Sequence, residues 1–171
     1  MKRAIFFAII AALVLVPWAV AYGYGNVKAA DASSSIEAAD PALVPSIHIF
    51  GNARGSISSG ELFTIDNSGA ATDLTFTLSL SNIGELAKYF RYMTFNVGLF
   101  VQSGNTTWEK MTDLGGASAP QLCINMQGSE LVFTLPGNAK YKVTVESGSY
   151  HSFSIAPGQS AAIPQFSLSS G

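Results

Sequence analysis

Two runs of strict alternation between apolar and polar residues constrain the fold of this chain more than any other feature. In residues 73–81 the apolar side chains fall at even positions, and in residues 92–101 mainly at odd positions, with Tyr92 and Phe100 on the other face. A period of two over eight or nine residues is typical of a β-strand with one buried face. Since only the turn Asn82-Ile83-Gly84 and a short charged segment join the runs, we expect an antiparallel all-β core. The predicted inner face comprises Leu74, Phe76, Leu78, Leu80, Met93, Phe95, Val97, Leu99 and Val101.

The rest of the chain predicts more strands of the same kind. Residues 83–90 interrupt the pattern with apolar side chains three and four apart, which indicates one short helical turn that caps the core. Pro136-Gly137-Asn138 and Ser147-Gly148 have the composition of hairpin turns. About eight to ten short strands favour a jelly-roll-type antiparallel β-sandwich over residues 46–171. The additional strands are expected at residues 46–50, 61–65, 107–111, 122–127, 130–135, 140–146, 150–155 and 163–168.

The first 21 residues predict a secretory signal peptide. Lys2-Arg3 precedes an unbroken apolar run over residues 4–16, and Pro17 then stands before Ala19-Val20-Ala21. A basic start, an apolar run of about 13 residues and a small-residue cleavage site are typical of such leaders. Cleavage after Ala21 would give a secreted, extracellular protein that meets the membrane only during secretion. Two alternatives stay open: an uncleaved anchor over residues 4–24, about long enough to span a bilayer, and a type IV prepilin cut after Arg3.

Residues 22–45 differ from everything that follows and form a predicted N-terminal arm. They are rich in Ala, Ser and Asp and have no strong period, so alone they would be disordered or loosely helical. A weak pattern of apolar and aromatic residues nevertheless suits a strand that pairs with an open sheet edge elsewhere. A flexible stalk is the alternative interpretation. The candidate residues for a donor strand are Tyr22, Tyr24, Val27, Ile36, Ala38 and Val44.

The charge content excludes one class of partner and favours another. Charged residues make up only 12% of the chain, whereas about a quarter is usual for soluble domains. The net charge of −2, with scattered Lys and Arg, excludes a basic nucleic-acid face. A weakly charged surface favours packing against neighbours. Cys123 is the single cysteine, so no internal disulfide is available, and we expect a partly buried, inert thiol in preference to an intermolecular bridge.

The sequence contains no motif that predicts catalysis. There is no H-E-x-x-H, no C-x-x-C and no phosphate-binding glycine loop, and the spacing of His48 and His151 supports no catalytic pair. We therefore expect no enzyme and no cofactor. Loop carboxylates such as Asp66 and Asp73 leave a calcium site open as a minor alternative. Asn105-Thr106-Thr107 is the single glycosylation sequon, on a predicted exposed loop.

Aromatic residues could also suggest a carbohydrate-binding face. Tyr22, Tyr24, Trp108, Tyr141 and Tyr150 are the residues concerned. Aromatic side chains at strand spacing more often belong to a core or an interface, which is the interpretation we prefer.

One segment resembles a known family. The run Leu78-Ser79-Leu80-Ser81-Asn82-Ile83-Gly84, followed by residues 86–92, resembles the strand, Asn-x-Gly turn, aromatic and strand segment of the TasA/camelysin family. The same outline includes a turn before the last strand, as in Ile155-Ala156-Pro157-Gly158-Gln159-Ser160. The resemblance extends to archaeal bundling pilins, which share the jelly-roll fold of that family. The resemblance implies a jelly-roll subunit of an extracellular filament, assembled by donor-strand exchange with identical subunits and bundled with neighbouring filaments. The camelysin name also carries a protease attribution, which no residue motif supports here.

Two other functions remain as alternatives at this stage. A membrane-anchored surface adhesion module, or a type IV-like pilin, would need residues 4–24 to persist as a helix. A secreted enzyme would need a catalytic group that the sequence does not supply.

Overall fold

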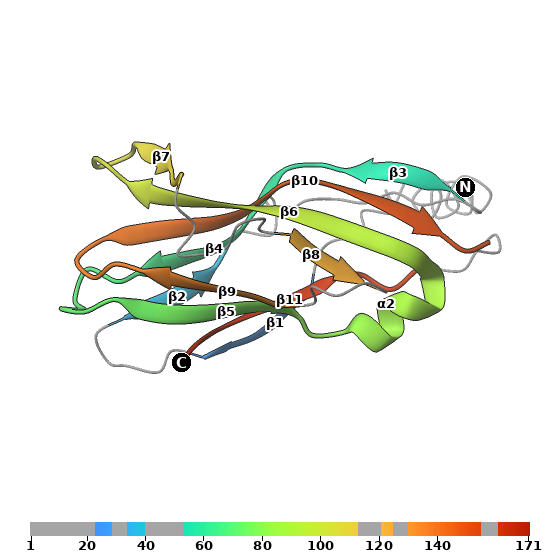
Figure 1. Cartoon of the computed structure of the whole chain (residues 1–171), viewed down its shortest axis with the longest axis horizontal. Coiled ribbons are helices and arrows are strands. Elements are labelled where there is room, and N and C mark those ends of the chain that lie inside the picture. Colours follow the sequence, from blue (N-terminus) through green and yellow to red (C-terminus); the bar gives the residue numbers. More distant parts are fainter. Residues whose placement is uncertain (1–22, 29–33, 40–52, 113–120, 125–129, 155–160) are drawn as a thin grey trace, which may run out of the picture.

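Two β-sheets and one short helix make up the described part of the chain (Figure 1). The computed structural model describes residues 23–28, 34–39, 53–112, 121–124, 130–154 and 161–171. The predicted all-β sandwich is confirmed. The elements are β1 (Gly23–Lys28), β2 (Ser35–Ala38), β3 (Arg54–Ile57), β4 (Gly60–Asp66), β5 (Leu74–Leu80), α2 (Ile83–Tyr89), β6 (Phe90–Gln102), β7 (Trp108–Lys110), β8 (Gln121–Ile124), β9 (Glu130–Leu135), β10 (Lys140–Ser152) and β11 (Gln165–Ser170).

The smaller sheet has the strand order β1-β11-β5-β9, and the larger has the order β2-β4-β10-β6-β7. In the larger sheet β3 also pairs with β10, and β8 with β6. The chain changes sheet on passing from β1 to β2, from β4 to β5, from β5 to β6, and at each step from β8 to β11. Such crossings are typical of Greek-key and jelly-roll sandwiches. Every described pairing is antiparallel except that of β1 with β11.

The strands β5 and β6, which the alternation predicted, face each other from different sheets. The helix α2 carries the chain from one sheet to the other at one end of the sandwich (Figure 1). Its Leu86 is fully buried and thus closes that end of the core, as the spacing predicted. The polar segment between the strands is therefore a crossover and not a hairpin.

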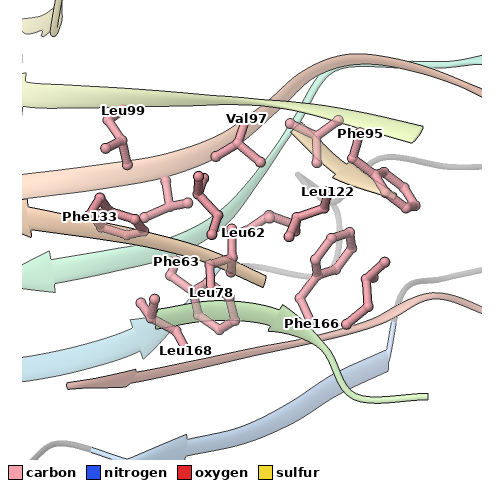
Figure 2. Close-up of a cluster of buried hydrophobic side chains, with 14 of the residues drawn as sticks. Leu62, Phe63, Leu78, Phe95, Val97, Leu99, Leu122, Phe133, Phe166 and Leu168 are labelled. Atoms are coloured by element: carbon pink, nitrogen blue, oxygen red, sulfur yellow. The ribbon is translucent and has the colours of Figure 1, made fainter. Parts of the chain in front are cut away.

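The core lies between the two sheets, where the predicted inner faces meet (Figure 2). Phe95 of β6 and Phe166 of β11 pack edge to face, with 5.1 Å between their ring centroids. Burying each large apolar side chain contributes about 1.5–3 kcal/mol to stability. Of the nine residues predicted for the inner face, Leu74 and Val101 are half-buried, and the other seven are buried: Phe76, Leu78, Leu80, Met93, Phe95, Val97 and Leu99.

The prediction of a hairpin turn at Ser147-Gly148 is wrong. β10 runs without a break from Lys140 to Ser152, and the register against β6 shifts between Val145 and Ser147. This shift is a β-bulge, for which a glycine inside a strand is a common marker. A Cβ on Gly148 would lie 2.3 Å from the carbonyl oxygen of Thr94, so glycine is needed for the close approach of β6. The predicted turn at residues 136–138 exists, but it joins β9 and β10 of opposite sheets.

Other boundaries differ in smaller ways. Residues Arg54–Ile57 form β3, a strand that is not among those the sequence predicted. β11 begins after Pro164, two residues later than expected. The predicted strand at residues 46–50 and the leader over residues 1–21 lie outside the described residues. The sheets also include β1 and β2 from the predicted arm, so the sandwich is not confined to residues 46–171.

Candidate functional site

The candidate site is the side of the sandwich where strands of the predicted arm meet its two sheets. β1 contains Tyr24 and Val27, and β2 contains Ile36 and Ala38. The other two candidate donor residues, Tyr22 and Val44, lie outside the described residues. β1 and β2 are each the first strand of a sheet, and they also contact each other. The arm therefore completes both sheets on one side.

β1 lies parallel to β11, along its outer edge (Figure 1). In the register, Tyr24 stands beside Phe166 and Val27 beside Leu168, with an irregularity between the two pairs. Phe166 and Leu168 are buried inner-face residues. β1 thus borders the part of the core that β11 would otherwise expose at the sheet edge. Parallel pairing is feasible because β1 and β11 come from opposite ends of the chain, and parallel strands require a long connection.

β2 lies antiparallel to β4 and is attached mainly by its backbone. Its register places Ile36 beside Ile65 and Ala38 beside Phe63, and the N–H of Ala39 donates to the Leu62 carbonyl at 2.9 Å. Only Ile36 is half-buried and packs on the core, whereas Ala38 and the other two residues are exposed. β2 therefore adds a sheet edge with little apolar burial.

Two buried polar atoms stand where β2 begins. Ser34 Oγ and Asn67 Oδ1 have no hydrogen-bond partner within the protein among the described residues. Ser34 directly precedes the pair formed by Ser35 and Asp66, and Asn67 directly follows it. A buried polar atom without a partner costs about 1–3 kcal/mol. This end of β2 is therefore less favourably packed than the core.

Asn82 holds the start of β11, the strand that receives β1. Its Nδ2 donates to the Ile163 carbonyl at 2.6 Å, and its Oδ1 accepts the Gln165 N–H at 2.9 Å. The N–H of Ser81 donates to the Gln165 carbonyl at 2.9 Å as well. Asn82 directly precedes α2 but does not cap it with its side chain, because both polar atoms bind β11. Sequence reasoning treated Asn82 only as a turn residue and missed this role, since no local signal predicts a contact some 80 residues away.

The remaining candidate residues are spread over the molecule and form no common site. Asn105 is exposed between β6 and β7, as an acceptor for a glycan requires. Cys123 is buried, and this burial raises the pKa of its thiol, which favours the inert protonated form. His48 lies outside the described residues, so its position relative to His151 is not described.

Two of the five aromatic residues that could have indicated a carbohydrate face are internal. Tyr141 and Tyr150 are buried, which confirms a core position for both. Trp108 is half-buried, and the Lys142 Nζ lies 4.6 Å from the centroid of its ring. Of the other two, Tyr24 lies in β1 and Tyr22 is not described.

No cluster of three or more His, Cys, Asp or Glu side chains suited to a metal ion occurs within the described residues. Asp66, a candidate calcium ligand, is bound by Lys140 and Ser68, and these hydrogen bonds lower its pKa to about 2. In the same part of the chain, none of the helices is long and apolar enough to cross a membrane.

Comparison with known proteins supplies no family. No model of a protein family matches this chain, and no curated protein matches its sequence. The resemblance to TasA/camelysin proteins and bundling pilins therefore depends on the residues quoted above, around Asn82.

Proposed function

We propose that this chain is the structural subunit of an extracellular filament and that it polymerises head to tail by donor-strand complementation. The observation that carries the proposal is the position of β1, an arm strand at a sheet edge that pairs with β11 and with no other described strand. The same edge can receive the identical strand from another chain. In that arrangement β1 of one subunit replaces β1 of the next beside Phe166 and Leu168.

Exchange of β1 between chains would keep its contacts and change only which chain supplies them. Main-chain hydrogen bonds along an open edge give affinity in such strand additions. Exchange of an identical element is a known route to oligomers, and a head-to-tail contact that does not close gives a filament. Asn82 supports this function because it fixes the start of the acceptor strand in the subunit's own core.

The composition agrees with a subunit that is covered by neighbours. Only 12% of the residues are charged, and the single cysteine leaves the fold without an internal disulfide. Subunit contacts would supply stability that small secreted domains commonly obtain from disulfides. The proposal includes secretion through cleavage at Ala21, no catalytic role, no cofactor and lateral association of filaments into bundles that could hold cells in a biofilm.

Removal of the arm tests the proposal. A chain that keeps its leader but lacks residues 22–44 should give monomers or misfolded protein and no filaments in negative-stain electron microscopy of secreted material. Filaments of normal length from this variant would contradict donor-strand assembly.

A peptide gives a test that does not depend on folding of a truncated chain. A synthetic peptide of residues 22–45 should occupy the β11 edge of the last subunit and stop growth, so wild-type filaments become shorter as its concentration rises. A peptide of the same composition in scrambled order is the matched control and should leave filament length unchanged. Equal effects of the two peptides would contradict recognition of the β1 sequence.

The second candidate is a membrane-anchored adhesion module or a type IV-like pilin, which the apolar run over residues 4–16 favours. Mass spectrometry of the native N-terminus separates the two functions. A mature chain that starts at Tyr22 supports the donor-strand filament, and one that starts at Ala4 supports the pilin.

A further inference from the structure

Strand β9 ends the smaller sheet on the side opposite to β1. It pairs with β5 in an unbroken antiparallel register, from Leu135 beside Leu74 to Glu130 beside Ser79. No other described strand pairs with β9 (Figure 1). β9 therefore presents an edge to which a further strand can be added.

The hydrogen bonds of β5 show which groups of β9 face outward. The N–H of Gly171 donates to the Thr75 carbonyl at 3.0 Å, so the main chain of Thr75 faces β11. In an antiparallel ladder alternate residues bond to opposite sides, so Thr77 and Ser79 also face β11. Their partners in β9 consequently direct their N–H and C=O groups away from β5. These groups are named the β9 edge here, and they belong to Glu130, Val132 and Thr134.

The β9 edge is unpaired within the described part of the chain. None of the described residues bonds to its N–H or C=O groups. Val132 is 54% exposed, more than any other large apolar residue in the same part of the chain. Backbone groups and apolar side chains both favour a partner over such exposure.

The other described edge strands carry features that protect them. Short strands, lysines and bulges are the usual means of keeping a sheet edge from pairing with another chain. β7 has three residues and ends in Glu109-Lys110, and β2 has four residues. β1 contains Lys28 and has an irregular register. β9 has six residues, a regular register, no lysine and one charged residue, Glu130.

We propose that β9 pairs with β9 of a second copy of this chain, antiparallel and about a twofold axis at Val132. In this register Val132 lies opposite Val132, and Glu130 lies opposite Thr134. A twofold contact uses the same surface on both chains, so the surface must be complementary to itself. The two smaller sheets then form one continuous sheet across the two chains.

The register centred on Val132 pairs every group of the β9 edge. The N–H and C=O of Val132 bond to those of the second Val132, and Glu130 exchanges the same bonds with Thr134 on either side. A register centred on Leu131 would leave Thr134 with no residue of the strand opposite it.

A register centred on Phe133 is also less complete. It would place Glu130 opposite Pro136, which has no N–H to donate. The Pro136 carbonyl already accepts the Asn67 side-chain amide at 2.9 Å and the Tyr141 hydroxyl at 2.8 Å. The groups of Glu130 would therefore stay unpaired.

The side chains agree with the register centred on Val132. The two exposed Val132 side chains would cover each other on the outer face of the sheet. The Glu130 carboxylates would lie opposite the Thr134 side chains and not opposite each other. Like charges directly opposite one another destabilise a strand pair, and this register avoids them.

Pairing through β9 supplies a lateral contact for the proposed filament. β1 and β9 lie at opposite edges of one sheet, so head-to-tail assembly through β1 leaves β9 available. Chains of neighbouring filaments could then be joined in bundles. This use rests on the proposed function, whereas the pairing of two β9 strands does not.

Disulfide trapping tests the pairing. In the Cys123→Ala background, Val132→Cys places two cysteines across the twofold axis, with Cα atoms about 5.5 Å apart, within the range of a disulfide. Oxidation of the secreted chain should give a linked homodimer on a non-reducing gel. Thr77→Cys is the matched control, because Thr77 is the register partner of Val132 but lies in the central strand β5. It should give at least about tenfold less dimer.

Two substitutions act on the pairing itself. Val132→Pro removes an N–H of the β9 edge and keeps the bonds to β5, because proline is tolerated where an edge N–H faces solvent. Val132→Lys sets like charges across the axis. Each should separate bundles into single filaments of normal length in electron microscopy. Thr106→Lys adds the same charge in an exposed loop and should leave the bundles intact.

Several outcomes would overturn the proposal. Equal yields of dimer from Val132→Cys and Thr77→Cys, or no dimer from either, would exclude pairing at Val132. A link between Val132→Cys and Lys28→Cys chains in preference to the homodimer would assign the β9 edge to the arm of a neighbour. Bundles that persist in Val132→Lys would exclude β9 as the lateral contact. If wild-type chains form no filaments, the proposed function fails, while the disulfide still decides whether β9 pairs.

Discussion

The strands β5 and β6 and the strands β1 and β2 belong to the same two sheets but are held in different ways. β5 and β6 have neighbours on both sides and present fully buried side chains to the core. Among the described strands β1 and β2 have one hydrogen-bonded neighbour each, and in β2 only Ile36 packs on the core. Stability varies within a protein, and elements that move come from its less stable parts. The edge strands β1 and β2 are therefore the elements that the proposed exchange between chains would use while the core persists.

The largest loss of stability is expected from a substitution in the core. Phe95→Ala removes a fully buried ring that packs on Phe166, and should lower the free energy of unfolding by about 3–5 kcal/mol. Ile36→Ala, at the half-buried arm position, should lower it by about 1 kcal/mol. Urea unfolding of the monomer measures both. Equal losses would show that the arm is as firmly held as the core.

The next prediction concerns Asn82, whose side chain holds the start of the acceptor strand β11. Asn82→Ala removes both hydrogen bonds to the start of β11 and should destabilise the monomer by about 1–3 kcal/mol and shorten filaments. Asn96→Ala is the matched control, because Asn96 is exposed and hydrogen-bonds only to nearby side chains on the sheet surface; the expected loss is about 0.5 kcal/mol. Thermal unfolding and electron microscopy of both variants decide whether Asn82 acts as inferred. Equal losses of stability and of filament length in the two variants would contradict a role of Asn82 in fixing the start of β11.

Acid titration tests whether the Asp66 carboxylate is held by residues of the core or by the arm. Asp66 is the register partner of Ser35 in β2, but the bonds that lower its pKa from 3.8 to about 2 come from Lys140 and Ser68. A lowered carboxyl pKa stabilises the fold above the ordinary pKa, and that stability is lost as the pH falls from about 4 to about 2. The side chain is one-third exposed, so the contribution is at most about 1 kcal/mol.

Asp66→Asn should remove this pH dependence, and Lys140→Gln should reduce it, because the hydrogen bonds from Ser68 remain. Ile36→Ala in the arm should retain it. Unfolding curves collected between pH 5 and pH 2 measure the effect. Loss of the dependence in Ile36→Ala would show that the arm, and not the core, holds the carboxylate.

The smallest expected effect concerns Cys123. Since burial raises the pKa of its thiol, a thiol reagent at pH 8 should modify the folded chain at least about tenfold more slowly than the unfolded chain. Cys123→Ala should lower stability by about 1 kcal/mol and leave filaments unchanged. Disulfide-linked chains on a non-reducing gel of wild-type filaments would contradict an inert thiol.

The elements that the sequence predicted best are those whose pattern is local. β5 and α2 begin and end where alternation and helical spacing placed them, and so does β9. Each depends on which residues repeat within a short window. The all-β sandwich follows from the number and length of such strands.

The features that the sequence could not supply depend on pairing between distant residues. The parallel match of β1 with β11 pairs segments from opposite ends of the sequence. In β10 the bulge at Glu146 stands beside Ser147-Gly148, whose composition imitates a turn signal inside one long strand. The contact of Asn82 with β11 is of the same kind. So is the edge contact of the Tyr92 and His151 rings, because strand register brings β6 and β10 together from separate segments.

The proposed function requires β1 of one chain to pair with β11 of another, and disulfide trapping tests this pairing. Two chains are prepared in the Cys123→Ala background, one with Lys28→Cys and the other with Ser169→Cys, and each carries a tag of different mass. Lys28 and Ser169 are register partners of β1 and β11, and adjacent strands lie about 4.8 Å apart, within the range of a disulfide. A chain with only one of these cysteines has no partner for it within itself.

After the two chains are mixed, assembled and oxidised, the account predicts a disulfide-linked pair that contains one chain of each mass. Filaments without that linked pair would contradict the claim, provided that the double variant Lys28→Cys/Ser169→Cys forms the bond within single chains.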